Sequence, residues 1–183
     1  SLAGAWAARS SLRPLGRYLL PLLLAGLLGG LGGGLLLLSG GDERAARRAR
    51  GFEAAALRLG LRPPAVRLGK SPTTHADGRE GLVALLADTP DIDAVFCSSD
   101  MLALGVLTEA RVRGIAVPDQ LAVMGFGDID FAQTVSPSLS TVRIDGTRMG
   151  QTAAQLIADR AEGQPVAEPV VDIGFSIIER DSA

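Results

Sequence analysis

The sequence predicts an α/β fold in which a mainly parallel, doubly wound sheet is covered by helices on both faces. From residue 42 onward, short apolar runs of strand length alternate with longer stretches in which apolar residues recur at helical spacing. This alternation favours parallel pairing, because each helix carries the chain back to the same end of the sheet. Hydrophobic residues make up 47% of the chain and aromatic residues only 4%, so an aliphatic core is expected.

The helices are expected between a capping residue and a glycine or proline. Asp42 and Asp100 occupy the N-cap positions of two of them, and Gly60 and Gly114 follow the last turns of these two helices. The predicted helices are residues 42–59, 79–87, 100–113 and 148–162. The strands are expected where apolar and β-branched residues run together. They are residues 66–68, 94–97, 121–126, 141–144 and 170–178.

Residues 1–41 differ in composition from the rest of the chain. They use only eight amino-acid types, contain no acidic residue, and include the 20 uncharged residues from Leu19 to Leu38. Three interpretations stay open. The stretch is long enough for a membrane or signal segment, its end at Leu35–Leu38 is typical of a short buried strand, or the segment is a frame-shifted piece of a GC-rich gene. Six glycines and a proline argue against a lone helix, so no membrane partner is predicted.

Charge and motifs exclude several functions. A formal net charge of −2 gives no reason to bind a polyanion, and the basic surface typical of nucleic-acid-binding domains is lacking. One cysteine and one histidine do not suffice for a disulfide or a zinc cluster. The tripeptide Gly69-Lys70-Ser71 imitates the end of a phosphate-binding loop, but Pro64 stands where that loop requires glycine. Neither an enzyme nor a metal or cofactor site is predicted.

Polar and charged residues follow the predicted strands, at the edge of the sheet where α/β proteins bind ligands. Hydroxyls and carboxylates suit a polyhydroxy ligand, and arginine adds bidentate capture of a carboxylate. Asp42 and Asp100 are more simply explained as helix caps, most arginines of residues 44–50 as a solvated helix face, and His75 as a surface residue in a polar loop. The candidate ligand-binding residues are Arg44, Arg48, Thr73, His75, Ser99, Gly127, Asp128 and Asp130.

Several stretches together resemble the LacI/GalR family of bacterial transcriptional regulators. They are "GDERAARRARGFEAAALRLGL" at 41–61, "DAVFCSSDMLALGVLTEARVRGIAVPDQLAVMGFGDIDFA" at 93–132, "SPSLSTVRID" at 136–145, "MGQTAAQLI" at 149–157 and "GFSIIERDS" at 174–182. The "GFGD" tetrapeptide resembles the corresponding stretch in the gluconate-operon repressor branch of this family. The resemblance implies a periplasmic-binding-protein-like type I fold with two lobes, in which a small molecule between the lobes alters the affinity of a homodimer for operator DNA.

The resemblance also implies roles for individual residues. The effector-contacting arginine of the family falls on Arg48, and the polar residue before the strand-end aspartate falls on Ser99. The aromatic stacking position falls near Thr73, so no stacking ring is expected there. The sugar-binding aspartate of the family falls on Gly127, and Asp128 immediately after it could supply a carboxylate from nearly the same place.

The implied domain organisation is mainly the C-terminal lobe of a two-lobed effector domain. Residues 1–41 are expected to be a remnant of the first lobe and its crossover, 42–144 the C-terminal lobe, 145–172 a segment returning to the first lobe, and 173–183 a terminal strand on the C-terminal lobe. The family's helix-turn-helix has no counterpart here, so operator DNA is expected to bind only through a headpiece outside these residues. The expected partner is a sugar or sugar acid, the expected assembly a homodimer, and the expected location the cytoplasm. The alternative is a periplasmic sugar-binding protein of a transport system.

Overall fold

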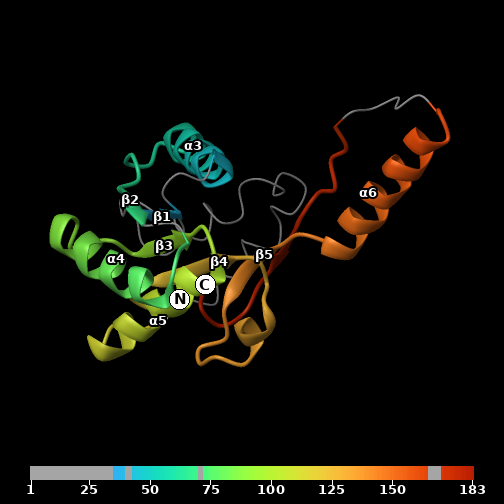
Figure 1. Cartoon of the computed structure of the whole chain (residues 1–183). Coiled ribbons are helices and arrows are strands. Elements are labelled where there is room, and N and C mark those ends of the chain that lie inside the picture. Colours follow the sequence, from blue (N-terminus) through green and yellow to red (C-terminus); the bar gives the residue numbers. More distant parts are fainter. Residues whose placement is uncertain (1–34, 40–42, 70–71, 165–169) are drawn as a thin grey trace, which may run out of the picture.

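A six-stranded sheet with the strand order β2-β1-β3-β4-β5-β6 forms the centre of the computed structural model (Figure 1), which describes residues 35–39, 43–69, 72–164 and 170–183. The strands are β1 Leu35–Ser39, β2 Val66–Gly69, β3 Ala94–Cys97, β4 Ala122–Phe126, β5 Ser140–Arg143 and β6 Ser176–Ile178. Neighbours from β2 to β5 pair in parallel, and β6 pairs with β5 antiparallel. The predicted mainly parallel sheet is confirmed.

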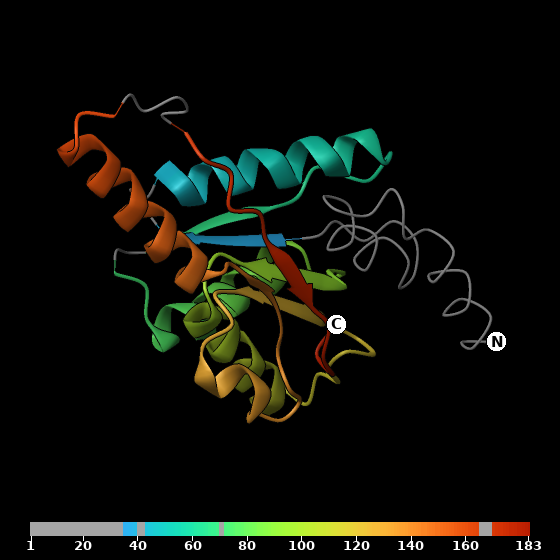
Figure 2. The ribbon, with the colours of Figure 1, turned by 90° about the vertical axis from the view of Figure 1, so that its right-hand side faces the viewer.

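Helices cover both faces of the sheet, as predicted (Figures 1 and 2). Helix α3 (Glu43–Arg58) lies on one face, and α4 (His75–Asp88) and α5 (Asp100–Val112) pack together on the other. The larger core lies under α4 and α5, and its fully buried members include Leu82, Leu85, Leu102 and Val123. The core under α3 is smaller, because α3 contributes mainly alanines and the ring of Phe52 to it.

Strand β1 lies inside the sheet, between β2 and β3. Its residues pair in register with both neighbours, for example Leu36 with Val66 and with Phe96. The strand interpretation of Leu35–Leu38 is therefore confirmed. Residues 1–34 and the expected cap Asp42 lie outside the described residues. In the described part of the chain, no helix is both long enough and apolar enough to cross a membrane.

The start of α4 differs from the prediction. Helix α4 begins at His75, four residues before the predicted start at Arg79, because Thr74 and Asp77 form a capping box. The Thr74 hydroxyl accepts a hydrogen bond from the Asp77 N–H, and the Asp77 carboxylate accepts one from the Thr74 N–H at 2.7 Å. The prediction of a polar loop at His75 is therefore wrong, since this residue opens the helix.

The C-terminal part also differs from the prediction. The predicted strand 170–178 is reduced to β6 at Ser176–Ile178, and residues 170–175 form no regular structure. Helix α6 (Gly146–Ala161), capped by Asp145, contains no buried residue and projects away from the sheet (Figures 1 and 2). Residues 170–175 lead back from this projection, so they have no neighbouring strand with which to pair.

Helices α4 and α5 cross with their backbones in close contact. A Cβ atom on Gly78 would lie 2.2 Å from the carbonyl oxygen of Leu102, and one on Gly105 would lie 2.2 Å from the carbonyl oxygen of His75. Both obstacles are backbone atoms, so neither can move aside as a flexible side chain would. The approach of these two helices therefore requires glycine on each side of the crossing.

We expect Gly105→Ala to lower the free energy of unfolding by roughly 1–3 kcal/mol, because the added methyl group forces α4 and α5 apart. Gly51→Ala is the matched control, since a Cβ there would meet no atom within 4 Å in the exposed middle of α3. That control should gain about 0.5–1 kcal/mol from reduced backbone entropy. Urea unfolding of both variants measures the difference. Equal stability changes would contradict the close crossing.

Candidate functional site

The carboxyl ends of β3 and β4 lie side by side, because these strands pair in parallel within the sheet. Helix α3 adds a cation to this edge. The guanidinium carbon of Arg48 stands 4.2 Å from the centroid of the Phe126 ring, the last residue of β4. A guanidinium over an aromatic face is held by the ring quadrupole. Arg48, which is partly buried, is therefore placed at the edge where the ligand was predicted to bind.

Two of the predicted hydroxyls meet at the same edge. The Oγ1 atom of Thr73 and the Oγ atom of Ser99 are 3.4 Å apart, and both residues are partly buried. Ser99 is the N-cap of α5, and its hydroxyl accepts a hydrogen bond from the Leu102 N–H. The neighbouring Ser98 hydroxyl is buried and has no hydrogen-bond partner among the described residues. The Thr73 hydroxyl, from the segment between β2 and α4, thus meets the Ser99 hydroxyl at the end of β3, beside the buried Ser98 hydroxyl.

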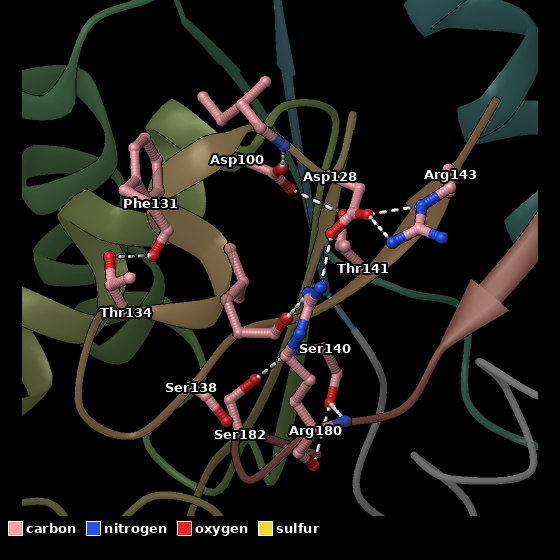
Figure 3. Close-up of polar contacts among 12 residues, drawn as sticks. Asp100, Asp128, Phe131, Thr134, Ser138, Ser140, Thr141, Arg143, Arg180 and Ser182 are labelled. Atoms are coloured by element: carbon pink, nitrogen blue, oxygen red, sulfur yellow. Dashed lines mark hydrogen bonds and ion pairs between the residues drawn. The ribbon is translucent and has the colours of Figure 1, made fainter. Parts of the chain in front are cut away.

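Asp100 is not the cap of α5, so that prediction is wrong. The capping position belongs to Ser99, and the Asp100 carboxylate points into the protein with 1% of the residue exposed. It accepts hydrogen bonds from the Thr141 hydroxyl at 2.7 Å and from the Ile129 N–H at 2.9 Å (Figure 3). A Cβ on Gly125 would lie 2.2 Å from this carboxylate. Asp100 therefore joins α5, the loop after β4 and strand β5.

Asp128 lies in a left-handed conformation with φ 54°, directly after Gly127 with φ 134°. This turn directs its carboxylate toward two arginines (Figure 3). One oxygen accepts from the Arg180 guanidinium at 2.7 Å, and the other from the Arg143 guanidinium. Only 6% of the Asp128 side chain is exposed. Burial alone would raise the pKa of Asp128, but the hydrogen bonds and charges of both arginines outweigh it and hold this pKa below its ordinary value.

The two arginines around Asp128 were not found from the sequence. Arg143 ends β5 and Arg180 follows β6, so each is far from Asp128 along the chain. A basic residue at the end of a predicted strand gives no signal of its partner. The parallel pairing of β4 with β5 brings Arg143 to the turn after β4, and the antiparallel pairing of β5 with β6 brings Arg180 there.

The remaining candidates are dispersed. No described hydrogen bond joins His75 to Thr73 or Ser99. The Nε2 atom of His75 is 2.9 Å from the Thr108 hydroxyl, which itself donates to the Leu104 carbonyl. The single Thr108 proton is thus engaged, so Nε2 is the donor to Thr108. Asp130 is exposed at the start of a short 3-10 helix, η2 (Asp130–Gln133), and Arg44 is exposed on α3. Their roles in ligand binding stay predictions.

The donors and acceptors gathered at this edge can hold a polar ligand. No cluster of potential metal ligands occurs among the described residues. The single cysteine, Cys97, is buried, and burial raises its pKa well above the ordinary value, so its thiol is not a nucleophile. Donors and acceptors at the ends of two adjacent strands, with an oriented guanidinium beside them, are the features of a binding site.

Comparison with known proteins agrees with this geometry. A family model described as periplasmic binding protein-like domain matches residues 34–183. The HTH-type transcriptional regulator GntR of Pseudomonas aeruginosa is 37% identical over 142 residues, which are 77% of this chain and 41% of that protein. A LacI family regulator from Silicibacter pomeroyi superposes with a TM-score of 0.78 at 32% identity, over 91% of this chain and 61% of that one. The CelR–cellobiose complex gives a TM-score of 0.76 at 29% identity, over 84% of this chain and 47% of that one.

The chain belongs to the periplasmic binding protein-like domain family. Within that class it is homologous to the LacI-family transcriptional regulators, which confirms the resemblance predicted from the sequence. It spans less than half the length of the curated relatives that it matches. The matched part is the effector domain, and these relatives are transcriptional regulators rather than enzymes.

The lowered pKa of Asp128 predicts how stability depends on pH. A depressed pKa in the folded state contributes stability above the unfolded pKa of about 3.9, and this contribution is lost as pH falls through the folded value. We expect Asp128→Asn to be less stable than the parent at neutral pH, with a difference that shrinks below about pH 4. Urea unfolding between neutral and acidic pH measures it, with exposed Asp119→Asn as the control. A difference that stays constant on acidification would contradict the ion pairs.

Proposed function

We propose that the chain is the effector-sensing part of a LacI-type transcriptional regulator, and that its effector is a sugar acid similar to gluconate. The observation that carries the proposal is the Arg48 guanidinium held over the Phe126 ring at the carboxyl edge of the sheet. The ring contacts one face of the guanidinium, whereas the N–H donors point outward in the guanidinium plane. This direction suits hydrogen bonds to a planar carboxylate.

The hydroxyl end of such a ligand would meet the segment between β2 and α4 and the end of β3. Thr73 and Ser99 supply paired hydroxyls that both donate and accept, as a polyhydroxy chain requires. In Asp128, each carboxylate oxygen already accepts from an arginine, although each keeps a further lone pair. A direct contact between Asp128 and ligand hydroxyls therefore stays a proposal, alongside contacts from Arg44, His75, the Gly127 backbone and Asp130.

The relatives support a sugar-like effector. The GntR regulators of Pseudomonas aeruginosa and Escherichia coli are 37% and 34% identical to this chain, and the CelR structure is a complex with cellobiose. Sensing of the same kind by this chain would act on operator DNA through a headpiece outside it, in a cytoplasmic homodimer. The alternative of a periplasmic transport protein is not favoured, because these relatives are transcriptional regulators.

The projecting helix supports the proposed division into lobes. Helix α6 has no buried residue, and apolar side chains on it and after it are exposed, among them Ile157 and Val170. We therefore propose that residues 145–172 belong with the first lobe and that 42–144 and 173–183 belong to the C-terminal lobe. Strand β1 lies between β2 and β3 in the sheet of the C-terminal lobe, so within segment 1–41 the remnant of the first lobe is proposed only for the residues before β1.

We expect Arg48→Ala to weaken gluconate binding about ten- to a hundredfold, because a charge-assisted hydrogen bond contributes roughly 1.5–3 kcal/mol. Calorimetry on the full chain measures the affinity, with the uncharged analogue glucitol as a second ligand. Arg50→Ala is the control, since this arginine is exposed on the same helix and pairs with Glu43.

Three outcomes separate the possibilities. Loss of gluconate affinity with Arg48→Ala, while glucitol affinity stays unchanged, supports recognition of the carboxylate by this arginine. Equal losses for both ligands would contradict that role. No binding of gluconate or of any related sugar acid by the parent chain would overturn the proposed effector class.

A further inference from the structure

The segment between β5 and β6, which contains the projecting helix α6, leaves the sheet and returns to it at the same place. The chain leaves after Arg143, at the end of β5, and returns at Ser176, which is the residue paired with Arg143 across the antiparallel β5–β6 ladder. Helix α6 and residues 170–175, which lie between these two points in the sequence, are outside the sheet (Figure 2). Asp128 contacts the chain on both sides of this place: Arg143 on the outgoing strand and Arg180 just after the returning strand.

The two arginines are held very differently. Only 14% of the Arg180 side chain is exposed, and besides Asp128 its guanidinium donates to the Leu139 carbonyl at 2.6 Å. Its backbone N–H also donates to the Ser140 hydroxyl. By contrast, 51% of the Arg143 side chain is exposed, and its described guanidinium contacts are with Asp128. A half-exposed ion pair opens at little cost in free energy, whereas a shielded pair with further hydrogen bonds persists.

We propose that Arg143, Asp128 and Arg180 form a joint that positions the loop 127–130 and sets the direction in which the segment after β5 leaves the sheet. Arg180 is the anchored side of this joint and Arg143 the movable side. Both are positioning residues, which act on the ligand through the loop and do not touch it. The link to ligand binding rests on the proposed function, because the loop borders the edge where Arg48 lies over Phe126.

The conformation of the loop explains why Asp128 can serve as the joint. Two successive residues with positive φ, Gly127 and Asp128, turn the chain sharply after β4. Aspartate and asparagine adopt the left-handed region more readily than other side chains. The turn aims the carboxylate at the β5–β6 pair (Figure 3). A ligand that fixes this loop would therefore favour the closed Arg143–Asp128 contact, and by reciprocity the closed contact would favour the ligand.

Hydrogen exchange on the full chain tests the joint without any ligand. In Arg143→Gln and in Asp128→Asn, the hydrogen-bonded amides beside the joint, those of Gly127, Arg148 and Met149, should exchange at least about fivefold faster than in the parent, since the local opening becomes more populated. Arg143→Lys keeps the charge and should restore most of the protection. Arg50→Gln, an exposed arginine paired with Glu43, should change nothing.

Two results of this experiment would overturn the joint. The first is unchanged exchange of the Gly127, Arg148 and Met149 amides in Arg143→Gln. The second is an equal acceleration throughout β3 and α5, which would show that the ion pair contributes only general stability.

Calorimetry with gluconate tests the link to the ligand. Arg143→Gln should weaken gluconate binding about five- to tenfold, a typical coupling between two sites, and Arg143→Lys should bind nearly as the parent does. Unchanged affinity together with faster exchange would refute the coupling. A parent chain that binds no gluconate would refute the proposed effector, and the exchange experiment would still decide whether the joint exists.

Discussion

The buried Asp100 carboxylate is the interaction on which the carboxyl edge of the sheet depends. It accepts hydrogen bonds from the Thr141 hydroxyl and the Ile129 N–H, and a carboxylate is tolerated in the interior only with such partners. The start of α5, the loop after β4 and strand β5 must therefore keep their relative positions. Ser99 and the loop containing Asp128 adjoin these three segments, so this one group helps to place both.

The two strand-end carboxylates have different physical roles. Asp100 is enclosed by the helix and the sheet, where it accepts hydrogen bonds from uncharged donors, whereas Asp128 is neutralised by two guanidiniums at the border of the molecule. The first holds the edge of the sheet rigid. The second joins that edge to the part of the chain that projects with α6. A rigid edge with one half-exposed ion pair beside it suits the proposed role of a domain that binds an effector and transmits its presence.

Local sequence patterns predicted most of the helices and strands. Where the predicted bounds were wrong, the error concerned one end of a single element. All five strands predicted after residue 42, the last of them shortened, and the cores of the four predicted helices were found, because periodic apolar residues and glycine stops act within a few residues of one another. The start of α4 was missed because its first turn is polar and depends on the Thr74–Asp77 capping box. The length of the last strand was overestimated because pairing with β5, and not apolar content, decides where β6 begins. Among the site residues, the meeting of Thr73 with Ser99 agrees with the shared strand edge, while the contact of His75 with Thr108 was not anticipated.

By itself, the sequence determined the α/β class, the alternation of helices and strands, and the homology to LacI-family regulators. These properties follow from the spacing of apolar residues and from motifs of consecutive residues. Only the tertiary structure decided which charges meet. The partners of Asp128 come from β5 and from the segment after β6, and the aromatic face under Arg48 comes from β4. Such contacts depend on strand order and on the direction of the last strand, which no local pattern encodes. The physical reason is that an ion pair joins residues by distance in space, whereas helices and turns are specified by distance along the chain.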